Sequence, residues 1–110
     1  MSRTTIVVNC NNPQQAQGVI QSILASENYE LKEKNGEYFY QNGVGLLVAP
    51  KFISYSFNGN TLTLQGWVRN FAIGGESKLT GVIGALPKKQ CKGVMDRIVN
   101  SIDGNILNSM

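Results

Sequence analysis

The sequence of 110 residues contains no histidine. This absence excludes imidazole as a general acid or base, as the activator of a serine or cysteine nucleophile, and as a metal ligand. The two cysteines, Cys10 and Cys91, are too few for a disulfide framework and have no CxxC spacing. We therefore expect a non-catalytic protein that uses no cofactor and no metal, with both thiols buried as small apolar side chains.

Charged residues and long apolar runs are also scarce. Charged residues make up 15% of the chain, against about 25% in typical soluble domains. The longest apolar run, Val44 to Pro50, is far shorter than the roughly 18 residues that a membrane helix needs. The apolar run near the start, Ile6 to Val8, is too short for a signal peptide. We expect a cytoplasmic protein with one domain over residues 1–104 and a C-terminal tail over residues 105–110.

The charges are unevenly distributed. Residues 1–50 carry three bases and four acids, whereas residues 51–110 carry seven bases and three acids, so the two halves have net charges of −1 and +4. A basic half attracts anionic partners, but this excess is small for a dedicated nucleic-acid binder.

Glycine and asparagine are abundant, and two Asn-Gly pairs predict tight β-hairpins. Asn35-Gly36 joins strands over 29–34 and 37–41, and the predicted register pairs Lys34 with Glu37 and Leu31 with Tyr40.

The second pair, Asn58-Gly59, joins strands over 51–57 and 60–70. Pairing outward from this turn places Tyr55 opposite Leu62 and Ile53 opposite Leu64. The alternation gives one apolar face, formed by Ile53, Tyr55, Phe57, Leu62, Leu64 and Val68. Phe52 and Trp67 fall on the opposite, polar face.

Helical spacing of apolar residues predicts two helices. The first begins after the N-cap Asn12 with Pro13 and ends near residues 26–28. Its apolar stripe contains Ala16, Val19, Ile20, Ile23 and Leu24. The second begins at Pro87 and ends at Asp103, with Gly104 as a left-handed cap. Its stripe contains Cys91, Val94, Met95, Ile98, Val99 and Ile102.

A β-branched strand over residues 4–9 precedes the first helix. The order is therefore β-α-β-β-β-β-α, which predicts an α+β fold in which an antiparallel sheet of about five strands carries both helices on one face. This order resembles that of TATA-binding-protein-like and helix-grip domains. The likeness concerns the fold and implies no function.

Three segments resemble small uncharacterised bacterial proteins. They are Arg3-Thr4-Thr5 with Val8-Asn9-Cys10, the turn Gly74-Gly75-Glu76, and the stretch from Thr80 to Lys89. The resemblance covers most of the chain. It implies a small stand-alone domain and no particular activity.

Two groups of residues are candidate sites. Phe52, Trp67 and Arg69, with Phe39 as a further candidate member, lie on the otherwise polar sheet face. There they form a protein interface, stack a planar ligand, or pack within their own chain. Gly81, Gly84, Lys88 and Lys89 surround a predicted helix N-terminus, where backbone N–H groups and ammonium groups hold an anion or simply face solvent.

These features lead to three functional hypotheses. The first is a binding or interaction domain that self-associates, or binds another protein, through the open face or edge of its sheet. The second is a pocket for an apolar or anionic small molecule between sheet and helices, with Val44 to Pro50 as one wall. The third is weak nucleic-acid binding through the basic second half.

Overall fold

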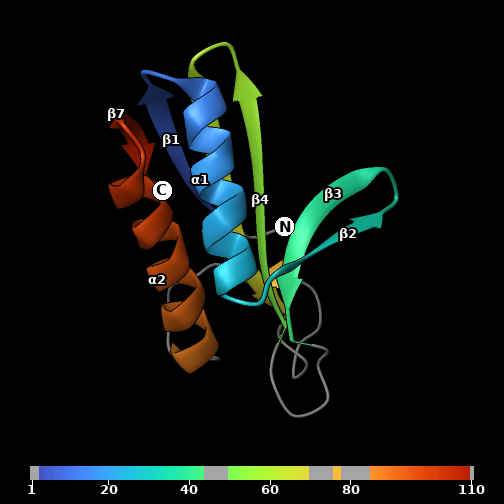
Figure 1. Ribbon diagram of the computed structural model, residues 1–110. Coiled ribbons are helices and arrows are strands. Elements are labelled where there is room, and N and C mark those ends of the chain that lie inside the picture. Colours follow the sequence, from blue (N-terminus) through green and yellow to red (C-terminus); the bar gives the residue numbers. More distant parts are fainter. Residues whose placement is uncertain (1–2, 44–49, 70–75, 78–84, 110) are drawn as a thin grey trace.

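The predicted α+β architecture is confirmed by the computed structural model, which describes residues 3–43, 50–69, 76–77 and 85–109 (Figure 1). An antiparallel sheet has the path β2-β3-β4-β5-β1-β7, and a short strand β6 pairs with β5. The elements in chain order are β1 (Thr4–Cys10), α1 (Pro13–Ser26), β2 (Glu30–Lys34), β3 (Glu37–Asn42), β4 (Lys51–Asn58), β5 (Thr61–Arg69), β6 (Glu76–Ser77), α2 (Ala85–Ser101) and β7 (Gly104–Ser109). Within these ranges no helix is long and apolar enough to span a membrane.

The hairpin of β2 and β3 has the predicted register. Lys34 pairs with Glu37 and Leu31 pairs with Tyr40. The turn residues Asn35 and Gly36 have φ angles of +54° and +83°. A type I′ turn requires positive φ at both central positions, and asparagine and glycine are the residues that adopt it most readily.

The hairpin of β4 and β5 differs from the prediction by two residues. Asn58 pairs with Thr61, so the turn consists of Gly59 and Asn60, and Tyr55 pairs with Leu64 rather than with Leu62. Gly59 has a φ of +61°, which suits the first central position of a type II′ turn. Because side chains alternate between faces with a period of two, this shift leaves the predicted apolar face unchanged.

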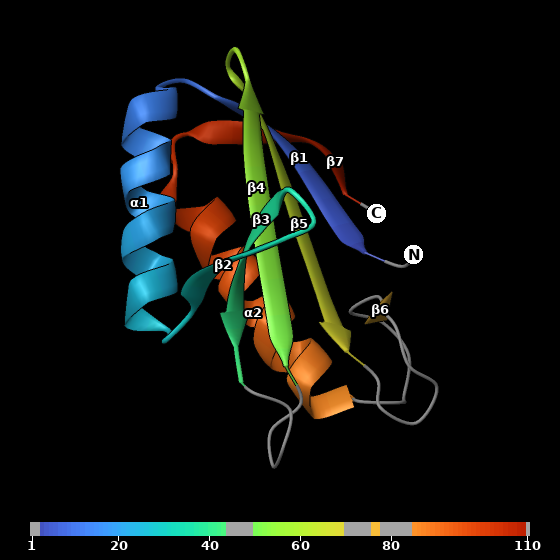
Figure 2. The same ribbon diagram turned by 90° about the vertical axis from the view of Figure 1, so that its right-hand side faces the viewer.

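Both helices pack on one face of the sheet, as predicted (Figure 2). The hydrophobic core lies between the sheet and the two helices. It contains buried residues from the predicted apolar stripes of the helices and from the predicted apolar face of the sheet. Its fully buried large side chains include Ile20, Leu24, Ile53, Leu62, Leu64, Met95 and Ile98. Burying each such side chain stabilises the fold by about 1.5–3 kcal/mol before conformational entropy is subtracted, so the two stripes are the main reason the helices dock here.

The predicted tail over residues 105–110 is wrong for residues 105–109, because they belong to β7, which pairs antiparallel with β1. Gly104 is likewise a strand residue opposite Cys10 rather than a left-handed helix cap. A Cβ at Gly104 would collide with the backbone carbonyl oxygen of Asn9. Glycine is therefore required by the close approach of β1.

We expect Gly104→Ala to lower the free energy of unfolding by about 1–3 kcal/mol, because β7 must move away from β1 to admit the methyl group. Gly18→Ala is the control, since a Cβ at this site in α1 meets nothing within 4 Å. It should raise stability by about 0.5–1 kcal/mol. Urea unfolding of the two variants measures both effects, and equal stabilisation by both would contradict the close contact.

Candidate functional site

Three aromatic rings form a cluster on the sheet face opposite the helices. Phe52 and Trp67 pair across β4 and β5, with nearly parallel rings whose centroids are 5.4 Å apart. Phe39 of β3 meets both rings edge-on, at 5.6 and 6.2 Å. Stacked and edge-to-face pairs of this kind contribute about 0.5–1.5 kcal/mol each beyond their buried area.

Arg3, just before β1, covers this cluster. Its guanidinium carbon lies 3.6 Å from the centroid of the Trp67 ring. It also donates two hydrogen bonds to the carboxylate of Glu37, at 2.5 and 3.0 Å, and one to Gln65 at 3.2 Å. The hydrogen bond from Arg3, reinforced by its charge, holds the pKa of Glu37 below its ordinary value, although partial burial opposes this effect. Arg3 thus joins the cation–π contact to an ion pair.

The predicted interface residues are brought together, but two of them are buried. Phe52 and Trp67 are each only 4% exposed, whereas Arg69 is exposed and lies 5.6 Å from the Phe52 ring. The sequence left three interpretations of these aromatic residues open, and one of them was packing within their own chain. Phe52 and Trp67 pack in this way. The sequence pattern placed these rings on the correct face with Phe39 as a candidate neighbour, and it did not reveal that Arg3 covers them.

The predicted anion site is only partly within the described residues. Gly81 and Gly84 lie outside them. Lys88 is 5% exposed and Lys89 is exposed, so the two lysines do not present a common surface.

Both cysteine thiols are fully buried. Burial raises the pKa of Cys10. Burial also raises the pKa of Cys91 to about 11, despite the opposing effects of the Tyr29 hydroxyl and the Lys51 charge. The Cys91 thiol donates to the carbonyl oxygen of Phe52 at 3.5 Å. Neither thiol is activated as a nucleophile.

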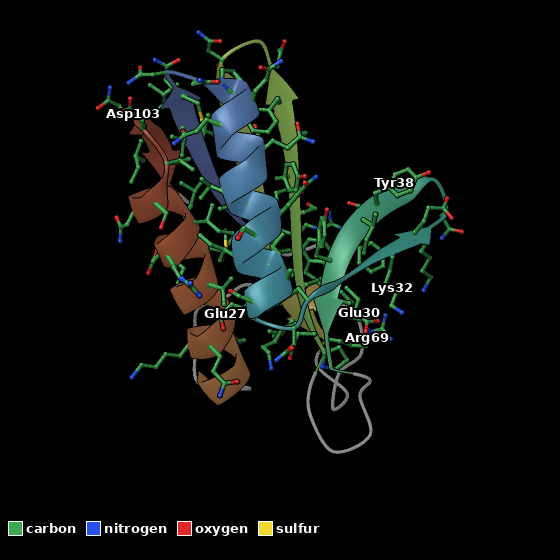
Figure 3. The ribbon with its side chains drawn as sticks, in the orientation of Figure 1. Glu27, Glu30, Lys32, Tyr38, Arg69 and Asp103 are labelled. Atoms are coloured by element: carbon green, nitrogen blue, oxygen red, sulfur yellow. The ribbon has the colours of Figure 1, made fainter. Side chains whose placement is uncertain are left out.

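The large apolar side chains that remain exposed gather at the two edges of the sheet. Among the described residues these are Leu31 and Tyr38 on the β2–β3 hairpin and Ile106 and Leu107 on β7, all more than half exposed. Figure 3 shows Tyr38 on a hairpin that projects away from both helices. The register of the hairpin places Leu31 and Tyr38 on the same face, but the helices do not extend far enough to cover them.

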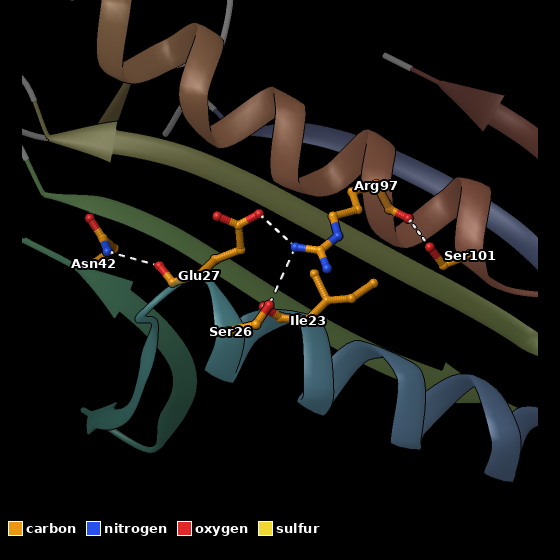
Figure 4. Close-up of polar contacts among 6 residues, drawn as sticks. All are labelled: Ile23, Ser26, Glu27, Asn42, Arg97 and Ser101. Carbon is orange, nitrogen blue, oxygen red and sulfur yellow. Dashed lines mark hydrogen bonds and ion pairs between the residues drawn. The ribbon is translucent and has the colours of Figure 1, made fainter.

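Polar contacts at the C-terminal end of α1 join three elements (Figure 4). Arg97 of α2 donates to the Glu27 carboxylate at 2.9 Å and to the Ser26 hydroxyl at 3.3 Å. Asn42 of β3 donates to the backbone carbonyls of Glu27 and Asn28, both at 3.1 Å. These contacts fix the junction where helix α1 turns into the sheet.

No family model, curated protein or solved structure matches this chain.

We expect Glu37→Gln to destabilise the protein by less than about 1 kcal/mol at neutral pH, since the carboxylate is partly exposed and solvent screens the pair. Because the folded-state pKa of Glu37 is lowered, its contribution is present above the ordinary glutamate pKa and is lost as the pH falls through the lowered value. The difference between wild type and variant should therefore disappear in acid, as measured by urea unfolding followed through Trp67 fluorescence.

Glu30→Gln is the control, because Glu30 pairs with Lys32 at 3.4 Å on the exposed hairpin, on a different strand from Glu37. A pH-dependent difference of the same size in this variant would contradict a specific role for the Arg3–Glu37 pair.

Proposed function

We propose that this chain is a non-catalytic interaction domain that self-associates through the exposed edge of β7. The observation that carries the proposal is the composition of this strand. β7 has the sequence Gly-Asn-Ile-Leu-Asn-Ser, with no charged residue, and it is the outer strand beside β1. Ile106 and Leu107 are 57% and 60% exposed. An uncharged edge with adjacent exposed apolar side chains is a template for adding another strand.

The other edge of the sheet is protected by charge. β2 carries charged side chains at four of its five positions, Glu30, Lys32, Glu33 and Lys34, and all five residues are exposed. Charged side chains on an edge strand oppose pairing with another chain. This contrast favours β7 over β2 as the edge that associates.

A two-fold axis perpendicular to the sheet relates two antiparallel copies of β7 and places residues of the same face opposite each other. Pairing centred on Leu107 puts this exposed side chain opposite its own copy, so the two apolar side chains cover one another at the centre of the interface. This self-matching centre favours a second copy of the chain over an unrelated partner.

The open sheet face is less suited to self-association than the edge. The two large aromatic side chains expected there, Phe52 and Trp67, already pack within their own chain. A second copy therefore has less apolar surface to bury on that face than beside β7.

We expect light scattering to detect a dimer whose population rises with protein concentration, because an interface of one short strand buries little area and binds weakly. Leu107→Lys should shift the protein to monomer by placing a charge at the centre of the paired strands. Leu31→Lys is the matched control, since Leu31 is 56% exposed on the opposite edge, and it should leave the dimer intact.

A wild-type protein that stays monomeric at millimolar concentration would overturn the proposal. So would equal loss of the dimer in both variants, which would indicate a non-specific effect of added charge.

A further inference from the structure

A polar cleft of about 420 Å³ lies where the C-terminal end of α1 meets α2 and the strands β3 and β4. It is lined by Glu27, Tyr29, Asn42, Lys51, Gln90, Gly93 and Val94. Its volume is within the range of about 300–1,000 Å³ that is typical of small-molecule sites. Glu27 and Asp103, which comes just before β7, lie at opposite ends of the helical layer (Figure 3), so the cleft is separate from the β7 edge.

Lys51 supplies a positive charge to this cleft although it is only 6% exposed. Burying an ammonium group is costly unless a counter-charge and hydrogen bonds compensate it. Within the described residues its hydrogen bond is a long one, to the side-chain oxygen of Gln90 at 3.5 Å, and no carboxylate pairs with it. The carboxylate of the cleft, Glu27, is held by Arg97. Lys51 therefore retains donor capacity toward a negatively charged ligand.

Tyr29 is positioned by the end of helix α1. The backbone N–H groups of Asn28 and Tyr29 donate to the carbonyls of Ala25 and Leu24, at 3.1 and 2.9 Å, and Asn28 has a φ of +64°. These two bonds and the left-handed residue define a Schellman motif, in which Tyr29 follows the cap and packs back toward Leu24. The motif explains why a residue next to a turn is only 6% exposed.

The hydroxyl of Tyr29 is buried beside the Cys91 thiol, whose sulfur is a weak acceptor, and no hydrogen bond of good geometry satisfies it within the described residues. Burial, together with the neighbouring Cys91 thiol and the Glu27 charge, raises the pKa of Tyr29. The hydroxyl therefore stays protonated and remains a hydrogen-bond donor at neutral pH. A buried donor that is satisfied this poorly is rare in proteins and favours an acceptor stronger than sulfur.

We infer that this cleft binds a small organic anion through its phosphate or carboxylate group, with Lys51 as the charge partner and the Tyr29 hydroxyl and Gln90 side-chain amide as hydrogen-bond donors. An anionic oxygen supplies the counter-charge that Lys51 lacks within the described residues and gives Tyr29 a stronger acceptor than the Cys91 sulfur. Glu27 lines the cleft. The Arg97 ion pair offsets the charge of the Glu27 carboxylate, and the Asn42 side chain donates to the Glu27 backbone carbonyl. Glu27 therefore does not repel an anion strongly.

The test is titration of the ¹⁵N-labelled full chain with inorganic phosphate and, separately, with acetate, at constant ionic strength. We expect saturable amide shifts at Lys51, Gln90 and Gly93 with at least one of the two anions. Saturation by phosphate alone assigns a phosphate ligand, and saturation by acetate alone assigns a carboxylate. Saturation by both supports a site that recognises the shared anionic oxygen.

Variants locate the binding in the cleft. Lys51→Met keeps the apolar stem of the side chain and should abolish the saturable shifts. Tyr29→Phe removes only the hydroxyl and should weaken binding about tenfold, the loss expected for one hydrogen bond to a charged group. Lys92→Met is the control, because Lys92 lies on the same helix as Gln90 but pairs with the exposed Asp96 at 2.6 Å, and it should bind as wild type does.

Shifts that rise linearly with anion concentration would overturn the inference, as would saturable shifts that survive in both Lys51→Met and Tyr29→Phe. Should Lys51→Met fail to fold, Tyr29→Phe and Lys92→Met still decide the outcome. The dimer measured by light scattering is independent of these titrations, so each proposal can fail alone.

Discussion

The pairing of β5 with β4 on one side and β1 on the other determines which side chains face each side of the sheet. Leu62 and Leu64 of β5 lie opposite Val8 and Ile6 of β1, and all four are buried beneath the helices. On the reverse face the same strand presents Trp67 to its partner on β4. A slip of one residue in this strand would exchange the two faces and remove the surface on which both helices dock.

The fold was predictable where information is local. Alternating apolar residues define the strand faces, and Pro13 after Asn12 defines the start of α1, whose N-cap oxygen accepts from the backbone N–H of Gln15. The register of β4 and β5 was not fixed in this way. Asn58-Gly59 and Gly59-Asn60 are both good two-residue turns, so turn chemistry alone does not distinguish two registers that share the same faces.

The features that the sequence did not reveal arise from contacts between residues that are far apart in the chain. The segment over residues 105–109 has no strong local signal, and it becomes a strand because β1 offers it an unpaired edge. Arg3 is far from Trp67 in sequence and lies over the Trp67 ring, a contact that no local pattern in the sequence indicates. Lys51 gave one available signal, a charge set among apolar neighbours in the chain. Its meaning depends on cleft residues from α2 and the end of α1, which only the tertiary structure brings near.

The position of β1 between β5 and β7 has a consequence for how this chain folds as it is made. The strand is synthesised before both of its neighbours, one of which comes from residues 61–69 and the other from residues 104–109. Closing such long loops carries an entropic cost before any contact is gained, which slows folding. On the ribosome, β1 must therefore wait with an unpaired edge until residues 104–109 have emerged. An unpaired strand edge is prone to aggregation, and β1 carries the consecutive apolar side chains Ile6, Val7 and Val8.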